Sequence, residues 1–140
     1  MHTHLNPYLS FKDNAREAMQ FYQSVFGGDL HISTFADYGS SGPEPGMENN
    51  VMHATLIVDG KSILMASDGG DGETKSNVSM SLMGSNAEEL HEYWDKLSTD
   101  GTITGAMEKQ VWGDEFGSCL DKFGVHWLIN ISQLENTVNS

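Results

Sequence analysis

One short pattern occurs twice in this chain of 140 residues, and it limits the folds that the chain can adopt. Residues 14–22 (NAREAMQFY) are matched 72 positions later by residues 86–94 (NAEELHEYW). In both copies asparagine is followed three residues later by glutamate, which is typical of the first turn of a helix. Apolar residues then follow at helical spacing. One alternating segment precedes each helix and three strand-like segments follow it, so the sequence predicts two β-α-β-β-β modules of the α+β class.

Each predicted element has a local signal. Alternating apolar and polar residues indicate the strands, Gly27-Gly28 and Asp100-Gly101 end the helices, and Asp59-Gly60 indicates a hairpin turn. In the first module we expect strands at 4–11, 29–38, 51–58 and 62–67, and a helix that Asn14 caps. In the second we expect strands at 77–82, 102–107, 116–120 and 125–131, and a helix that Ser85 or Asn86 caps. Residues 68–75 are expected to link the modules, and residues 39–50 to form a loop.

A helix can cover only one face of a four-stranded sheet, so each module leaves one sheet face uncovered. In the first strand of each module this face carries polar residues, among them Asn6, Tyr8 and Ser79. Two such sheets can curve toward each other and enclose a cleft, and a polar lining suits an open or ligand-filled cavity better than a closed core. We therefore expect a single domain, 1–140, in which modules of about 4–68 and 76–132 form a curved mixed sheet around a cleft.

The charge of the chain excludes several classes of partner. Seven Lys and Arg stand against 20 Asp and Glu, and the net charge of −13 repels nucleic-acid backbones and anionic membrane surfaces. No apolar run is long enough to span a bilayer, and the N-terminus has no signal-peptide pattern. Cys119 is the only cysteine, so no internal disulfide is possible and a cytoplasmic location is expected. Its strand-like surroundings predict a buried side chain rather than a nucleophile.

Several strings occur in an order and at a spacing that are similar to those of a known family. They are Asn6-Pro7-Tyr8-Leu9-Ser10-Phe11, Ala15-Arg16-Glu17-Ala18 before Phe21-Tyr22, Val25-Phe26-Gly27-Gly28, Met52-His53-Ala54, Leu64-Met65-Ala66-Ser67-Asp68, Trp112-Gly113, and Asp121-Lys122-Phe123-Gly124 before Trp127. With the two modules, they resemble the PhnB-like branch of the vicinal oxygen chelate superfamily, which includes glyoxalase I, extradiol dioxygenases and bleomycin-resistance proteins. The resemblance implies a glyoxalase/bleomycin-resistance-like fold, a small-molecule ligand and a homodimer. The ubiquinone-related methylation named for this branch has no support here, because the sequence has no glycine-rich strand-to-helix turn for a nucleotide-like cofactor.

Metal-dependent members of the superfamily hold one divalent ion with four His or Glu side chains, one from each of four strands. Matching the strands places these positions at Asn6, Met65, Ser79 and Leu128. Asn, Ser and Met are weak ligands for such ions and Leu is none, so we expect no metal at the four-ligand centre and no cofactor. A different centre built from His4, His53 and His126 is the less favoured alternative.

Strand alternation and the resemblance together select the candidate ligand-binding residues. His53 shares a strand face with Thr55, and Trp112 with Phe116 can wall one end of a cleft and stack on a ligand. For Trp112, ordinary packing is an equally good interpretation, and for Trp127 it is the better one. The candidate set is Asn6, Tyr8, His53, Met65, Ser79, Trp112, Phe116 and Leu128. Of these, Tyr8, His53, Met65 and Trp112 are expected to line one cavity over which residues 39–50 can close.

Two classes of function remain. The first is metal-independent binding of a small molecule in a cleft, as in bleomycin-resistance proteins, and the missing metal ligands favour it. The second is a lyase, isomerase or dioxygenase that uses a divalent metal in a displaced ligand set. The sequence contains no Ser-His-Asp order and no activated cysteine that would indicate nucleophilic catalysis.

Overall fold

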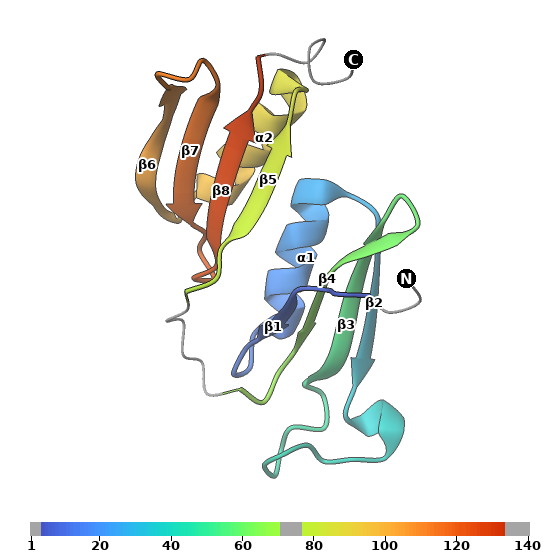
Figure 1. Cartoon of the computed structure of the whole chain (residues 1–140). Helices are drawn as coiled ribbons and strands as arrows, with labels where there is room; N and C mark the ends of the chain where they lie inside the picture. Colours follow the sequence, from blue (N-terminus) through green and yellow to red (C-terminus); the bar gives the residue numbers. More distant parts are fainter. Residues whose placement is uncertain (1–3, 71–76, 134–140) are drawn as a thin grey trace. The chain divides into compact units, whose positions relative to one another are not determined.

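The computed structural model describes residues 4–70 and 77–133, and it divides into two compact units, Met1–Glu73 and Thr74–Ser140. Each unit holds one open, four-stranded mixed sheet and one long helix (Figure 1). The predicted α+β class and the two β-α-β-β-β modules are confirmed. The cleft and the single-domain organisation stay predictions. The predicted linker residues 71–75 and residue 76 lie outside the described residues.

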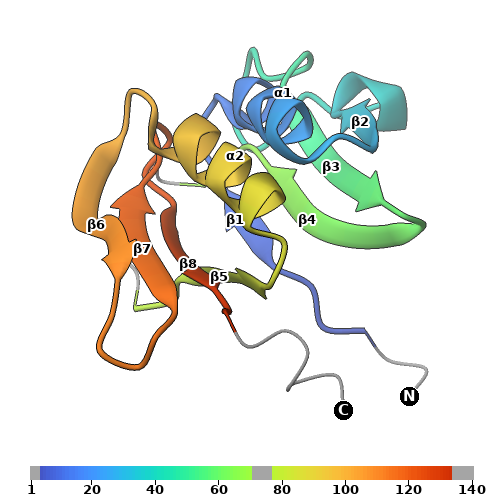
Figure 2. The same ribbon diagram turned by 90° about the horizontal axis from the view of Figure 1, so that it is seen from above.

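The first unit contains β1 (Tyr8–Ser10), α1 (Ala15–Phe26), β2 (Asp29–Thr34), the 3₁₀ helix η1 (Ala36–Tyr38), β3 (Val51–Val58) and β4 (Lys61–Ser67). Its strands are ordered β1-β4-β3-β2, with β1 parallel to β4 and the other pairs antiparallel. α1 lies along one face of this sheet (Figure 2). The core between them consists mainly of Ala15, Ala18, Met19, Tyr22, Val25, Ala54, Leu56, Leu64 and Ala66.

The N-terminus of α1 is capped by a residue that is distant in the sequence. Asn14 makes no side-chain capping hydrogen bond, because its backbone (φ −121°, ψ 23°) is not in the extended conformation that a capping side chain needs. The predicted cap is therefore wrong. The buried Asp68 carboxylate takes its place: Oδ1 accepts from the Ala15 N–H at 2.9 Å and Oδ2 from the Val51 N–H at 2.8 Å. Asp68, predicted to begin the linker, thus joins the starts of α1 and β3.

The second unit contains β5 (Met80–Gly84), α2 (Ala87–Ser98), β6 (Thr102–Lys109), β7 (Glu115–Leu120) and β8 (His126–Ile131). Its strands are ordered β5-β8-β7-β6, and β5 runs parallel to β8. Asn86 caps α2 as predicted, since its side chain accepts a hydrogen bond from the Glu89 N–H at 3.1 Å. The core residues are Leu90, Trp94, Leu97, Cys119, Trp127, Ile129 and Ile131.

Some strands end earlier than predicted, either because the segment pairs over only part of its length or because side-chain hydrogen bonds form a turn. β3 has the predicted bounds, whereas β1 is shorter than the predicted segment 4–11 because only Tyr8–Ser10 pairs with β4. β2 ends at Thr34, where Thr34 N–H donates to Asp37 Oδ2 at 2.8 Å and Asp37 N–H donates to Thr34 Oγ1 at 3.2 Å. Because of this turn, the last residues of the predicted strand form η1 instead of continuing β2. Within residues 4–70 and 77–133, no helix has the length and apolar content needed to cross a membrane.

Candidate functional site

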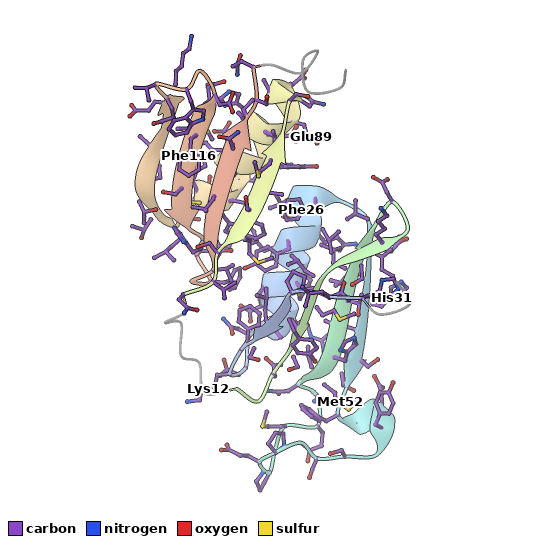
Figure 3. The ribbon with its side chains drawn as sticks, viewed as in Figure 1. Lys12, Phe26, His31, Met52, Glu89 and Phe116 are labelled. Atoms are coloured by element: carbon purple, nitrogen blue, oxygen red, sulfur yellow. The ribbon has the colours of Figure 1, made fainter. Side chains whose placement is uncertain are left out.

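The face of the first sheet that α1 leaves uncovered carries a row of side chains from all four strands. The strand register pairs His31 of β2 with Thr55 of β3, Thr55 with Met65 of β4, and Met65 with Tyr8 of β1. Directly paired residues project from the same face of a sheet. Figure 3 labels His31 at the β2 end of this row. The register therefore brings the predicted site residues Tyr8 and Met65 side by side.

His53 lies beside this row and is held by two hydroxyl groups. Its Nδ1 lies 3.3 Å from the Tyr8 hydroxyl, and its Nε2 lies 2.8 Å from Thr55 Oγ1. A phenol is a better proton donor than an alcohol, so the arrangement favoured on chemistry has Tyr8 donating to Nδ1 and Nε2–H donating to Thr55. The Thr55 hydroxyl proton and the lone pairs of the half-exposed Tyr8 oxygen then remain for a ligand. The predicted residues Tyr8, His53 and Met65 thus lie together on one sheet face.

The uncovered face of the second sheet carries two rows of paired side chains. One row contains Glu108, Phe116, Asn130 and Met83, and the other contains Ser118, Leu128 and Ser81. Leu128 pairs with Ser81 on the parallel edge strand, as Met65 pairs with Tyr8 in the first sheet. Met65 and Leu128 therefore both project from the uncovered face of the strand next to the parallel edge strand, and the matching of the four ligand positions stays a prediction.

His126 of β8 also lies between hydroxyl groups. Its Nδ1 lies 2.6 Å from Ser79 Oγ, and its Nε2 lies 3.5 Å from Thr104 Oγ1. Thr104 Oγ1 in turn lies 2.8 Å from Ser118 Oγ. Each sheet face therefore holds a histidine between two hydroxyl-bearing side chains. The predicted site residue Ser79 belongs to this second group.

Trp112 lies in the turn between β6 and β7, and its ring meets Phe116 edge-on with the ring centroids 6.3 Å apart. Phe116 projects from β7 (Figure 3). The turn is fixed to β8, because Asn130 Nδ2 donates to Asp114 Oδ2 at 3.0 Å and the Gln133 N–H donates to Asp114 Oδ1 at 3.3 Å. Trp112 is 56% exposed, so it does not belong to the core of its unit, and its role in ligand binding stays a prediction.

The predicted site residues fall into two groups, one in each unit. Tyr8, His53 and Met65 lie together on the first sheet, and Asn6 lies two residues before Tyr8, half-buried. Ser79, Leu128, Phe116 and Trp112 belong to the second unit. That Tyr8, His53, Met65 and Trp112 line one cavity stays a prediction.

Sequence reasoning missed the partners that hold these residues. Thr104, Ser118 and Asn130 were not selected, although alternation places Ser118 on the same strand face as Phe116. Only the strand register brings Thr104 to His126 and Asn130 to Asp114.

The residues at the four expected ligand positions do not fit a divalent metal. Asn6 and Ser79 offer neutral oxygens, Met65 offers a thioether, and Leu128 offers no donor atom. In the part of the chain that the structure describes, no three His, Cys, Asp or Glu side chains are grouped as metal ligands would be. His53 and His126 each have both ring nitrogens within hydrogen-bond distance of hydroxyl groups.

Cys119 and Trp127 are packing residues. Cys119 is fully buried, and burial together with the nearby Asp121 carboxylate raises the pKa of its thiol to about 11. A thiol with this pKa is almost entirely protonated at neutral pH and is a poor nucleophile. Trp127 is also buried, and its Nε1 donates to Asp121 Oδ2 at 2.9 Å. Both agree with the predicted structural roles.

Comparisons of this chain with protein families, with known sequences and with solved structures find similar proteins that agree with one another. Residues 3–130 match the model of the family described as 3-demethylubiquinone-9 3-methyltransferase. The protein YjdN of Escherichia coli is 30% identical over 95% of this chain and 98% of its own length. The crystal structure of PA1353 from Pseudomonas aeruginosa is 32% identical with a TM-score of 0.79, covering 93% of this chain and 98% of that one. The PhnB protein from Bacillus cereus is 27% identical with a TM-score of 0.74, covering 93% and 100%.

A more distant solved structure shares the fold alone. FosX, a fosfomycin resistance protein from Listeria monocytogenes, is 12% identical with a TM-score of 0.63, covering 96% of each chain. These matches agree with the two-module architecture and with the order of the sequence strings. The chain belongs to the PhnB-like family described as 3-demethylubiquinone-9 3-methyltransferase.

Proposed function

We propose that this protein is a cytoplasmic binding protein for a small organic molecule, which it holds on the uncovered faces of its sheets without a four-ligand metal centre. The observation that carries this proposal is the group formed by Tyr8, His53 and Thr55 on the first sheet. Tyr8 and His53 are 45 positions apart in the sequence, and they meet on the face that the helix leaves free.

The arrangement of this group supports ligand binding. Polar side chains on a solvated sheet face need no partners, because water satisfies them. Here the two hydroxyl groups fix the ring of His53 and leave a donor and an acceptor directed to solvent. Met65 and the Tyr8 ring add apolar surface beside them. A few oriented polar groups next to apolar surface are typical of a small-molecule site.

Methyl transfer, which the family description names, is not part of this proposal. Glycine-rich strand-to-helix turns let a backbone approach the phosphates or ribose of a nucleotide-like cofactor. The segments that lead into α1 and α2 are Lys12-Asp13-Asn14 and Ser85-Asn86, and neither contains glycine. Neither of these two strand-to-helix segments therefore offers such a cradle.

The alternative function is a lyase, isomerase or dioxygenase reaction with a divalent metal. A structure of a FosX variant contains Mn(II) and a dihydroxypropylphosphonic acid. In this chain the matched positions Asn6, Met65, Ser79 and Leu128 do not supply His or carboxylate ligands. The binding role is therefore the better supported of the two.

Elemental analysis separates these functions. We expect protein purified without chelator to contain less than about 0.1 equivalent of Zn, Ni, Fe or Mn, because weak neutral ligands do not retain these ions through purification. The measurement is mass spectrometry of the metals before and after dialysis against EDTA. A near-stoichiometric metal that EDTA removes, together with an activity lost on removal, would establish the metal-dependent function instead.

A fragment screen tests the binding proposal. Thermal-shift hits from a library of neutral, cationic and anionic fragments are measured by calorimetry on the wild type and on Tyr8→Phe, His53→Gln and Trp112→Ala. We expect hits on the first sheet to lose about tenfold in affinity with Tyr8→Phe, which corresponds to about 1.4 kcal/mol. His31→Gln is the matched control, because His31 lies on the same face outside the hydrogen-bonded group. The proposal fails if no fragment binds or if no hit responds to any site variant.

A further inference from the structure

We infer that the uncovered face of the second sheet around Trp112, Phe116 and Glu108 is a binding site for an organic cation such as a quaternary ammonium group. This inference rests on the proposed function and names the ligand class for the second unit. It follows from an exposed aromatic pair, the rigidity of the turn that carries it, and the sign of the charges around it.

The rings of Trp112 and Phe116 are exposed to solvent, although exposing aromatic rings does not stabilise the folded unit. Trp112 is 56% exposed, whereas Trp94 and Trp127 of the same unit are 7% and 2% exposed. The rings of Trp112 and Phe116 are inclined by 63°, so their faces are not stacked against each other. Phe116 is only half-buried and shares its sheet face with Glu108 and Asn130. Aromatic surface is therefore available on this sheet face.

The turn that holds Trp112 is fixed by hydrogen bonds. The Gln110 N–H donates to the Asp114 carbonyl oxygen at 2.8 Å, and the Gly113 N–H donates to the Gln110 carbonyl oxygen at 3.0 Å. The two carboxylate oxygens of Asp114 are held by Asn130 and by the Gln133 backbone, as described above. A rigid aromatic loses less conformational entropy when a ligand binds than a mobile one does.

The charges on this face are negative. Glu108 is exposed and lies directly across from Phe116 in the strand register, and its carboxylate forms no ion pair within the described residues. Asp114 is held by an amide and a backbone N–H, which are neutral donors, so its charge is not neutralised. An anionic ligand would meet two carboxylates here.

Among residues 77–133, no cation is placed to neutralise these two carboxylates. Residues 77–133 contain three lysines and no arginine. Lys109 pairs with Glu115 on the opposite face of the sheet from Glu108, Lys96 bonds Glu92 on α2, and Lys122 lies 5.7 Å from the Phe123 ring centroid. A cation over the face of Trp is attracted by the ring's quadrupole. The aromatic pair and Glu108 therefore favour a positively charged ligand over a neutral one of the same shape.

Choline and its neutral carbon isostere, 3,3-dimethylbutan-1-ol, provide a matched pair of probes. Binding is measured by calorimetry and by the change in tryptophan fluorescence on addition of the probe, which reports mainly on Trp112 because the other two tryptophans are buried away from it. At 0.15 M NaCl we expect saturable binding of choline and at least tenfold weaker binding of the isostere. Glu108→Gln should weaken choline at least fivefold. Trp112→Ala should abolish binding, and Trp112→Phe should restore part of it.

Glu88→Gln is the control for the overall negative charge, because Glu88 is exposed in the first turn of α2 and removal of its charge leaves the aromatic pair intact. It should leave choline binding unchanged. Equal binding of both probes, absence of choline binding, or equal losses in Glu88→Gln and Glu108→Gln would overturn the inference. The inference can fail while the proposed function stands: a neutral or anionic fragment that needs Trp112 overturns only the cation preference, whereas a screen in which nothing binds overturns both.

Discussion

Gly27 and Gly28 end α1 with two successive residues in the left-handed region, at φ +76° and +84°. Their surroundings differ. A Cβ on Gly27 would have no atom within 4 Å, whereas a Cβ on Gly28 would overlap the carbonyl oxygen of Ile57 and lie 2.8 Å from Val58 Cγ2. Gly27 is therefore needed for its backbone conformation alone, and Gly28 also allows the segment between α1 and β2 to approach β3 closely.

Replacing the two glycines separates these requirements. We expect Gly27→Ala to lower the free energy of unfolding by about 1 kcal/mol, because it adds only the cost of a positive φ. Gly28→Ala should lower it by about 3 kcal/mol or more, since the backbone at Ile57 must also move. Urea denaturation of both variants measures the difference. Equal losses would show that the strands move apart freely at this position.

Cys119 supports a prediction about pH. Its pKa of about 11 compares with an ordinary value of 9.0, and burial is the larger cause, followed by the Asp121 carboxylate. The thiolate is the reactive form and the side chain is fully buried, so at pH 8 alkylation by iodoacetamide should be at least about 100-fold slower in the folded protein than in the urea-unfolded chain. A folded rate at pH 8 equal to the unfolded rate would contradict the raised pKa.

At the scale of elements, Asp68 joins β4 to the starts of α1 and β3. We expect Asp68→Ala to lower the free energy of unfolding by about 2–4 kcal/mol, because two buried N–H groups lose a charged acceptor. Asn14→Ala should cost less than about 0.5 kcal/mol, since Asn14 makes no cap, and Asn86→Ala about 1 kcal/mol. Thermal or urea unfolding of the three variants gives the order. A larger loss for Asn14→Ala than for Asp68→Ala would contradict the assigned cap.

The elements that could be predicted from the sequence have local causes. The ends of α1 follow from helical spacing and from Gly27-Gly28, and β3 follows from its run of apolar and β-branched residues. The cap at Asp68 could not be predicted in this way, because it joins residues that are 53 positions apart. Sequence periodicity contains no information on such a pair.

The residues of the candidate site likewise divide into those that the sequence could predict and those that it could not. Alternation placed Tyr8 on the uncovered face, and the family resemblance selected Met65 and Leu128, which each pair with a residue of the parallel edge strand of their sheet. The bond between Ser79 and His126 joins residues 47 positions apart and depends on β5 pairing with β8 in one register. A slip of one residue would turn Ser79 to the other face. Hydrogen-bond partners of this kind can be identified only when the register of the paired strands is known.

At the scale of the whole molecule, the second module leaves apolar surface at a sheet edge. β5 is an edge strand of the second sheet, and Met83 on it is 74% exposed, with Val78 just before it 67% exposed. Edge strands that combine free backbone groups with apolar side chains favour pairing with another chain. The net charge of −13 opposes self-association, because two copies repel each other. The two effects depend differently on salt.

We therefore expect a homodimer that becomes tighter as salt is raised. Screening between 0.05 and 0.5 M NaCl removes much of the like-charge repulsion, while burial of apolar surface is not weakened. Sedimentation equilibrium at micromolar concentration should give about twice the chain mass of 15.4 kDa.

Met83→Glu should weaken the dimer, because it places a charge on the exposed edge strand and adds to the repulsion. Gln20→Glu adds the same charge on the exposed side of α1 and should change the dissociation constant much less. A mass of 15.4 kDa at all concentrations and salt levels would show that charge repulsion exceeds the apolar attraction. A dimer that weakens with salt would show that ion pairs, rather than the apolar edge at β5, hold the copies together.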